Sequence, residues 1–425
     1  PIFNGGALSA NLDLAKVRQR IEVARYERAV QAGFREVADG LAARDALERQ
    51  ILSEQQRVDA SRRAYDLAQR RHQEGEDSSL SVLDAQRTLY GSEQALLRAR
   101  LAAPSPDAAL TKWRQSAALA LEAGQLSEVD RTLAQAELQI LGGLSDLSEL
   151  SAARRIAVGE TRADRATASL LDLSPQAGRE SAKRFAEAAA IIGLADSARS
   201  HALALRQADV LKRIGEEFRD RAGFDSAIAH LRILLSGLDN LDDTLAWAET
   251  QERLGLTLAG LASLSGEPAL LDEAAGCYRA ALDDLRCEQA KPLWRRLQTH
   301  LGTLALQKGE ATQDHALIEE AVAALTAARS VIDAADDPQN AVRLEYNLAR
   351  ALAAEGQHSG SIANLEAAFN GFQTVSKSWT RESHPDIWAD VQDRSGTVLR
   401  LMGQSYREPV VLEEAIAAFD RALEI

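Results

Sequence analysis

The amino-acid sequence predicts an all-α protein, in which a long, coiled-coil-like helical hairpin precedes a right-handed α-α solenoid of short helix pairs. Three observations support this prediction. Alanine and leucine dominate the composition, aromatic residues make up only 4% of the 425 residues, and there are nine prolines. Apolar residues recur at helical spacing through the first hundred residues. A second pattern, with a period of forty-seven residues, runs through the C-terminal half and indicates stacked repeats.

The net charge, the cysteines and the lack of long apolar runs limit which partners and which kinds of site the sequence allows. A net charge of −14 argues against binding to phosphates, so no nucleic acid partner is expected. Cys277 and Cys287 lie in no metal-binding spacing and are expected to be free thiols. No apolar run approaches the ~20 residues of a membrane-spanning helix. The chain begins with Pro1 instead of methionine, so we expect it to be a piece of a longer protein.

The first element is predicted to be one very long helix. Apolar residues recur at helical spacing over residues 14–67, and no proline interrupts residues 2–103. A helix of about 65 residues would be ~100 Å long, which requires neighbours in a coiled coil or a helical barrel. Gly75 is predicted to end it, because glycine adopts the left-handed turn without steric cost. Good capping residues at 77–79 precede a shorter returning helix over 79–102.

Several stretches of this hairpin match one family. They are PIFNGG at the start, FREVADGL at 34–41, RRHQEGEDSSL at 70–80 and VLDAQR at 82–87. With them, residues 1–103 resemble the outer-membrane efflux factors, the TolC-like trimeric channels of tripartite drug-export pumps. His72 departs from the family, which usually has an aromatic residue there.

The resemblance implies a role for the turn of the hairpin. In the family this tip faces a periplasmic adaptor protein and helps to hold the channel shut, which would assign protein binding to Arg71, Gly75, Leu80 and Asp84. The alternative is that these residues only form the turn and cap the helices. The resemblance covers about a quarter of a full family member, so the segment alone would not form a channel.

Two prolines in the stretch AAPSPD predict a break in the helix, and we place a linker at residues 104–107. Beyond it a four-position signature recurs. A small residue is followed nineteen residues later by an alanine, four residues later by a bulky residue, and three residues later by a further apolar residue. In successive repeats these positions are Ala208, Ala227, Leu231 and Leu234; Gly255, Ala274, Tyr278 and Ala281; Gly302, Ala321, Leu325 and Ala328; Ala349, Ala368, Phe372 and Val375; and Gly396, Ala415, Phe419 and Ala422.

These positions explain why helix pairs should stack. Small residues let two antiparallel helices approach closely, and the bulky residue fills the gap between adjacent pairs. Segments such as LDEAAGCYRAAL and LEEAIAAFDRAL resemble the second helix of the tetratricopeptide repeat. We therefore predict two irregular tetratricopeptide-like pairs over 108–190 and five repeats of forty-seven residues over 191–425, which makes seven helix pairs.

Nothing in the sequence indicates catalysis. None of the seven histidines lies in a spacing typical of a metal site or of a nucleophile and its base, and no nucleotide-binding, hydrolase or metalloprotease motif occurs. Glu319 and Glu320 are predicted to lie in the first turn of a helix, where carboxylates favour the helix dipole. We therefore expect no enzyme activity, no cofactor and no metal site.

A tetratricopeptide-like stack offers a concave groove lined by the first helix of each pair, and such a groove could hold a protein or peptide. The alternative is an ordinary solvated face. The positions predicted to line the groove and bind a partner are Glu252, Arg296, Thr299, Arg343, Tyr346 and Asp393.

Three hypotheses for function follow. The preferred one is a non-enzymatic protein-protein interaction scaffold joined to a remnant of an efflux channel, because the repeats make up three quarters of the chain. The second is a component of a tripartite efflux system with a repeat tail. The third is an artificial join near 103–106. The compartment stays open, because the hairpin implies the outer membrane and periplasm whereas tetratricopeptide scaffolds are usually cytoplasmic.

Overall fold

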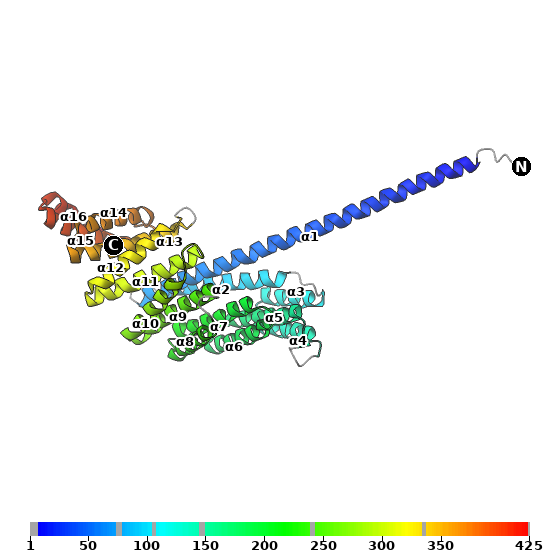
Figure 1. Ribbon diagram of the computed structural model, residues 1–425, viewed down its shortest axis with the longest axis horizontal. Helices are drawn as coiled ribbons and strands as arrows, with labels where there is room; N and C mark the ends of the chain where they lie inside the picture. Colours follow the sequence, from blue (N-terminus) through cyan, green and yellow to red (C-terminus); the bar gives the residue numbers. More distant parts are fainter. Residues whose placement is uncertain are drawn as a thin grey trace. The chain divides into compact units, whose positions relative to one another are not determined.

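The computed structural model describes residues 7–73, 79–103, 108–143, 149–238, 243–333 and 337–423. These residues form sixteen helices and no strand, which confirms the predicted all-α class (Figure 1). The helices before the regular repeats are α1 (Ala7–Gln73), α2 (Ser79–Ala102), α3 (Ala108–Glu122), α4 (Leu126–Leu141), α5 (Ala152–Leu170) and α6 (Pro175–Gly193). The five regular pairs are α7 (Ser197–Glu217) and α8 (Arg221–Ser236), α9 (Thr244–Ser265) and α10 (Pro268–Asp284), α11 (Lys291–Thr312) and α12 (His315–Ser330), α13 (Pro338–Ser359) and α14 (Ile362–Ser378), and α15 (Pro385–Tyr406) and α16 (Pro409–Leu423).

The contacts divide the chain into two compact units. One contains Pro1–Leu150 and Glu160–Asp172, and the other contains Ser151–Gly159 and Leu173–Ile425. The predicted linker at 104–107 lies outside the described residues.

The first unit begins with the predicted hairpin. The 67 residues of α1 correspond to about 100 Å of helix, and the shorter α2 returns along its C-terminal part. Val58 and Tyr65 of α1 pack against Leu89 and Leu96 of α2, and all four are at most 5% exposed. The long helix and the short returning helix are therefore confirmed. Gly75, predicted to end the first helix, lies outside the described residues.

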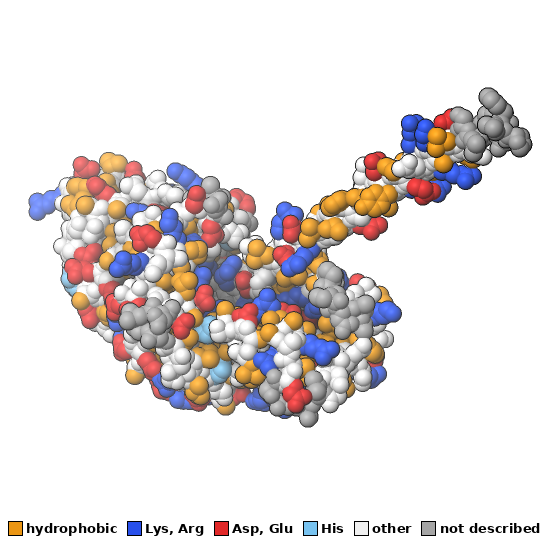
Figure 2. Space-filling model, turned by 45° about the vertical axis from the view of Figure 1, so that its right-hand side comes forward, with side chains coloured by type: hydrophobic (Ala, Val, Ile, Leu, Met, Phe, Trp, Pro, Cys, Tyr) orange, Lys and Arg blue, Asp and Glu red, His pale blue; other side chains and the backbone are white. Residues whose placement is uncertain are grey.

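The N-terminal part of α1 has no partner helix among the described residues. Every described side chain from position 11 to 46 is exposed, including Phe34 (74%) and Tyr26 (71%). Figure 2 shows orange hydrophobic side chains along the N-terminal part of α1. We call the large apolar side chains on this part of α1 the α1 stripe; it consists of Leu12, Leu14, Val17, Ile21, Val23, Tyr26, Val30, Phe34, Val37 and Leu41.

The far end of α2 packs on the first short helix pair of the same unit. Leu97 and Leu101 of α2 share a buried cluster with Leu121 of α3 and Leu133 of α4. The returning helix and this pair therefore share one core, although the sequence predicts a linker between them.

The second unit contains the regular repeats. Helices α7, α9, α11, α13 and α15 begin forty-seven residues apart, and so do α8, α10, α12, α14 and α16. The recurring alanines of the signature, from Ala227 to Ala415, are at most 2% exposed. The two helices of each pair pack on each other, and the second helix of each pair but the last packs on the first helix of the next pair, as the contacts between α8 and α9 and between α12 and α13 illustrate. The repeat period predicted from the sequence thus coincides with the helix boundaries.

A second contact, between a glycine on the first helix and a bulky side chain on the second, recurs near the turn of four of the five regular pairs. Gly309 lies against Ile318, and a β-carbon built there would be 2.8 Å from the Ile318 side chain; Gly356 and Leu365 repeat this arrangement. The four-position sequence signature does not contain this glycine. It is not present in every repeat, since the repeat that begins with α9 has Ala262 at the equivalent position.

Candidate functional site

Two of the four predicted hairpin-tip residues can be placed. Leu80 and Asp84 lie on successive turns of α2, and Leu80 is 64% exposed. The Asp84 carboxylate is 3.9 Å from Arg87 one turn further on. The side chain of Arg71 and the whole of Gly75 lie outside the described residues.

The predicted groove residues Glu252 and Arg296 form an ion pair between α9 and α11. The guanidinium donates to both carboxylate oxygens, at 2.7 and 2.9 Å, and His300 Nε2 lies 3.6 Å from the same carboxylate. Burial alone would raise the pKa of Glu252, but the hydrogen bonds from Arg296, together with the nearby His300, outweigh it and lower that pKa to about 2. Glu252 is therefore ionised and fully engaged within the stack.

Tyr346, another predicted groove residue, is similarly engaged. Its hydroxyl donates to Asp390 of α15, and its ring lies 6.4 Å from Phe372 and 5.9 Å from Trp379, measured between ring centroids. Burial, reinforced by the negative charge of Asp390, raises the pKa of Tyr346 to about 12. Its phenol is therefore a hydrogen-bond donor that links two successive pairs.

Thr299 and Arg343 bond within their own helices. The Thr299 hydroxyl donates to the carbonyl oxygen of Arg295, at 2.8 Å, and Arg343 donates to the side chain of Asn340. Hydroxyls in helix interiors commonly bond to the preceding turn in this way.

The contacts of Glu252 and Tyr346 belong to a ladder along the first helices of the pairs. Each rung joins residues forty-four positions apart: Asp209 with Arg253, Glu252 with Arg296, and Tyr346 with Asp390. Three positions that sequence reasoning assigned to partner binding thus hold successive helix pairs in register.

Asp393, the remaining predicted groove residue, lines a pocket of about 380 Å³ in the second unit. Its wall carries a charge pair, since Arg350 lies 3.0 Å from Glu310. Arg394, also in the wall, lies 2.7 Å from Asp390 on the preceding turn of α15. The full lining is Glu310, Gln313, Ile318, Arg350, Ala353, Ala354, Gln357, His358, Asp393, Arg394, Thr397, Val398 and Leu401. Side chains from three consecutive helix pairs therefore meet around one hollow that has charged walls and apolar patches.

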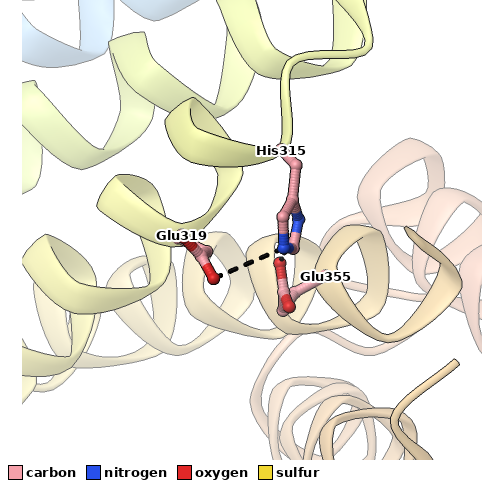
Figure 3. A group of neighbouring side chains, drawn as sticks. All are labelled: His315, Glu319 and Glu355. Atoms are coloured by element: carbon pink, nitrogen blue, oxygen red, sulfur yellow. Dashed lines mark ion pairs between the residues drawn. The ribbon is translucent and has the colours of Figure 1, made fainter. Parts of the chain in front are cut away.

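Sequence reasoning missed a cluster beside this pocket, formed by His315, Glu319 and Glu355 (Figure 3). It placed Glu319 in the first turn of its helix, but α12 begins at His315, so Glu319 lies one turn further on and faces that histidine. A His-x-x-x-Glu spacing at a helix start was the signal that could have indicated it.

Comparison with known proteins shows what the hairpin is similar to. Residues 1–113 match the family model described as "Outer membrane efflux protein". The solvent efflux pump outer membrane protein SrpC of Pseudomonas putida is 50% identical over 101 residues, which are 24% of this chain and 22% of that protein. The cation efflux system protein CusC of Escherichia coli is 43% identical over 97 residues, or 23% of this chain and 21% of that one. The resemblance predicted for the hairpin is confirmed.

The chain spans about a fifth of the length of these relatives. A solved structure titled "Circular tandem repeat protein with novel repeat topology and enhanced subunit contact surfaces" covers 90% of this chain and 97% of its own, at 17% identity and a TM-score of 0.29. A TM-score this low does not establish a shared fold. The tetratricopeptide resemblance of residues 108–425 stays a prediction. Within the described residues, no helix combines the length and the apolar composition that crossing a bilayer requires.

Proposed function

We propose that the protein is a non-enzymatic scaffold, in which a right-handed, tetratricopeptide-like solenoid binds a segment of another protein along the first helices of its pairs. The observation that carries this proposal is the pocket around Arg350 and Asp393, whose walls come from three consecutive helix pairs. A site assembled from several repeats is extended along the stack, which suits an elongated peptide better than a compact small molecule.

The lining indicates the chemistry of the bound segment. Acidic Glu310 and Asp393 lie close to basic Arg350 and Arg394, and Val398 and Leu401 supply apolar surface. Such a wall would complement a peptide of mixed charge with one or two apolar anchor side chains.

Three groups with strongly shifted pKa values, Cys277, Glu252 and Tyr346, support a non-enzymatic role. Burial raises the pKa of the Cys277 thiol to about 12, so it stays protonated and is a poor nucleophile at neutral pH. The shifted Glu252 and Tyr346 are both engaged in contacts between helix pairs. These shifts accompany the packing of the stack and need no bound substrate to explain them.

A selection experiment tests the proposal. Short random peptides are selected on the full chain, and their affinity is measured by fluorescence anisotropy for the wild type and for Arg350→Glu. Loss of at least about tenfold in affinity is expected for the variant, because a charge on the pocket wall is reversed. Arg232→Glu on α8 is the matched control, since Arg232 is an exposed arginine paired with Glu273 on the second helices of the pairs. Equal loss or equal retention in both variants would contradict the proposal, provided that both keep the helical signal of the wild type.

A second candidate is a component of a tripartite efflux system. The match of residues 1–113 to the efflux family favours it, and so does the α1 stripe, whose exposed apolar side chains need partner helices. In this case the hairpin would assemble as a trimer, and Leu80 and Asp84 near the tip would contact a periplasmic adaptor protein. The two candidates differ in what the α1 stripe does, because only the second requires assembly through it.

A further inference from the structure

Three side chains from two neighbouring helix pairs converge on one another (Figure 3). His315 is the first residue of α12, Glu319 lies one turn further along the same helix, and Glu355 comes from α13. His315 Nε2 is 3.3 Å from a Glu319 oxygen, and His315 Nδ1 is 3.2 Å from Glu355 Oε2. One imidazole therefore has a carboxylate at each of its nitrogens.

The contact between His315 and Glu355 is short but is not a hydrogen bond. Glu355 is 9% exposed, and both its Oε2 and the facing Nδ1 of His315 are buried atoms without a hydrogen-bond partner. The distance alone would fit an ion pair, whereas the angles do not direct an N–H toward the oxygen. Buried polar atoms of this kind are costly unless something satisfies them. Two electron-rich atoms that face each other in this way are arranged as ligands of a shared cation.

The repeat supplies an internal comparison for this site. Forty-seven residues before Glu355 stands Lys308, and forty-seven residues before Glu319 stands Asp272. These two earlier residues form an ion pair. The lysine of that pair neutralises its carboxylate. In the later repeat both positions are glutamates, so the same place in the fold carries two carboxylates and one imidazole. The fold does not require this set, and two neighbouring carboxylates without a lysine between them favour a bound cation.

We propose that His315, Glu319 and Glu355 bind a divalent transition-metal ion of the zinc class. Each residue offers one ligand atom, and the three atoms lie within 4.8 Å of one another. Tetrahedral coordination with bonds of ~2.0–2.1 Å needs ligand atoms about 3.3 Å apart. His315 Nδ1 and Glu355 Oε2 already have about this separation, and the Glu319 side chain, which lies beside Nε2, must rotate toward Nδ1 to complete the site. The imidazole favours zinc, cobalt or nickel over calcium and magnesium, which prefer oxygen ligands alone. Water fills the fourth position.

His358 supports the orientation of the ligand ring. Its imidazole stacks on that of His315, with centroids 4.5 Å apart and planes inclined by 17°. His358 also lines the pocket, as does Ile318 of α12. The metal would therefore tie α12 to α13 at the edge of the proposed protein-binding surface, although the site stands independently of that function.

Metal titration of the full chain tests the site. The chelator-treated protein is titrated with Zn²⁺ by calorimetry, and with Co²⁺ while the visible absorption of tetrahedral cobalt is recorded. We expect one equivalent to bind through this cluster and the thermal unfolding midpoint to rise with the concentration of free metal. Binding should weaken on acidification, because the imidazole must lose its proton to act as a ligand.

Two variants assign the site. Glu355→Lys restores the lysine–carboxylate arrangement of Lys308 and Asp272, so it should fold normally and bind Zn²⁺ at least about tenfold more weakly. His315→Ala should also lose the tetrahedral cobalt spectrum, whereas the control His384→Ala should retain it. Unchanged binding in Glu355→Lys and His315→Ala would overturn the proposal, and so would the absence of stoichiometric binding by the wild type. Stability that responds to pH but not to metal would likewise overturn it, in favour of a protonated imidazole bridging two carboxylates.

Discussion

Gly255 on α9 lies directly against the ring of Tyr278 on α10: a β-carbon at Gly255 would be 2.4 Å from the ring carbon Cε1 of Tyr278. Gly396 and Phe419 repeat this relationship in the last pair, where the corresponding distance is 2.8 Å. The missing side chain on one helix thus makes room for the bulky side chain on the other. This contact sets how closely the two helices of a pair approach.

Gly255→Ala should therefore destabilise the protein by about 1–3 kcal/mol, because the new methyl group overpacks the contact with Tyr278. Urea unfolding followed by circular dichroism measures the change. Gly276→Ala on α10 is the matched control, since nothing lies within 4 Å of a β-carbon there, and it should stabilise by about 0.5–1 kcal/mol. Equal effects of the two substitutions would show that helix propensity, and not the contact, decides the result.

The ends of the first helices share a left-handed residue that recurs with the repeat. It is glycine at Gly266 and Gly360, but Gln313 and Arg407 adopt the same conformation with φ of 57° and 58°. A side chain with a β-carbon costs roughly 1–2 kcal/mol there, partly offset by the greater freedom of glycine in the unfolded chain.

Gln313→Gly and Arg407→Gly should each raise the free energy of unfolding by about 0.5–1 kcal/mol, measured by chemical denaturation. Gly360→Ala is the reverse control and should lower it by about 1 kcal/mol, because its site is open and only the backbone is strained. If both glycine substitutions lowered the stability, the left-handed caps would not be the strained positions that we infer.

The buried carboxylate of Glu252 predicts an acid-sensitive stack. The pKa of Glu252 is about 2 in the folded protein, whereas its ordinary value is 4.5. The ionised carboxylate therefore adds to the free energy of unfolding above about pH 4.5, and this added stability is lost as the pH falls toward 2. Glu252→Gln should cost about 2–3 kcal/mol at pH 7 and flatten the loss of stability over that range. Glu273→Gln, in an exposed pair, should cost less than about 1 kcal/mol. Parallel acid profiles for the wild type and Glu252→Gln would refute the assignment.

The α1 stripe predicts self-association. Phe34 and Val37 are 74% and 61% exposed, and burying such side chains against another copy of the helix would be favourable. We expect the full chain to form oligomers in light-scattering measurements of mass, and Phe34→Gln with Val37→Gln to shift them toward the monomer. Arg35→Gln between these positions should leave the mass unchanged. A monomeric wild type would remove the main physical support for the efflux-type assembly.

Most of the fold could be predicted from the sequence because its signals are periodic. The long α1 and the returning α2 follow from apolar residues at helical spacing with no proline between them, and the forty-seven-residue spacing of the later helices follows from recurring small and bulky residues. The shared core of α2 and the first short pair could not be predicted, because Leu97 and Leu101 carry no sign of which neighbour they contact.

The candidate sites were harder to predict for a physical reason. Glu252 and Tyr346 were placed on the correct helices, but sequence spacing does not reveal that each bonds to a residue forty-four positions further on. His315 lies at the start of α12 and Glu355 near the end of α13, so the two residues are far apart in the sequence and no local motif contains both.

The central claim is that the second unit is a linear stack in which each helix pair depends on its neighbours. Removing residues 385–425, which contain α15 and α16, tests it most directly. In urea unfolding followed by circular dichroism, the shortened chain should have a helical signal reduced by about the share of the two helices and a modestly lower stability. Removing residues 338–425 should lower both quantities again by a similar amount. Loss of most of the helical signal after the first removal would contradict the account.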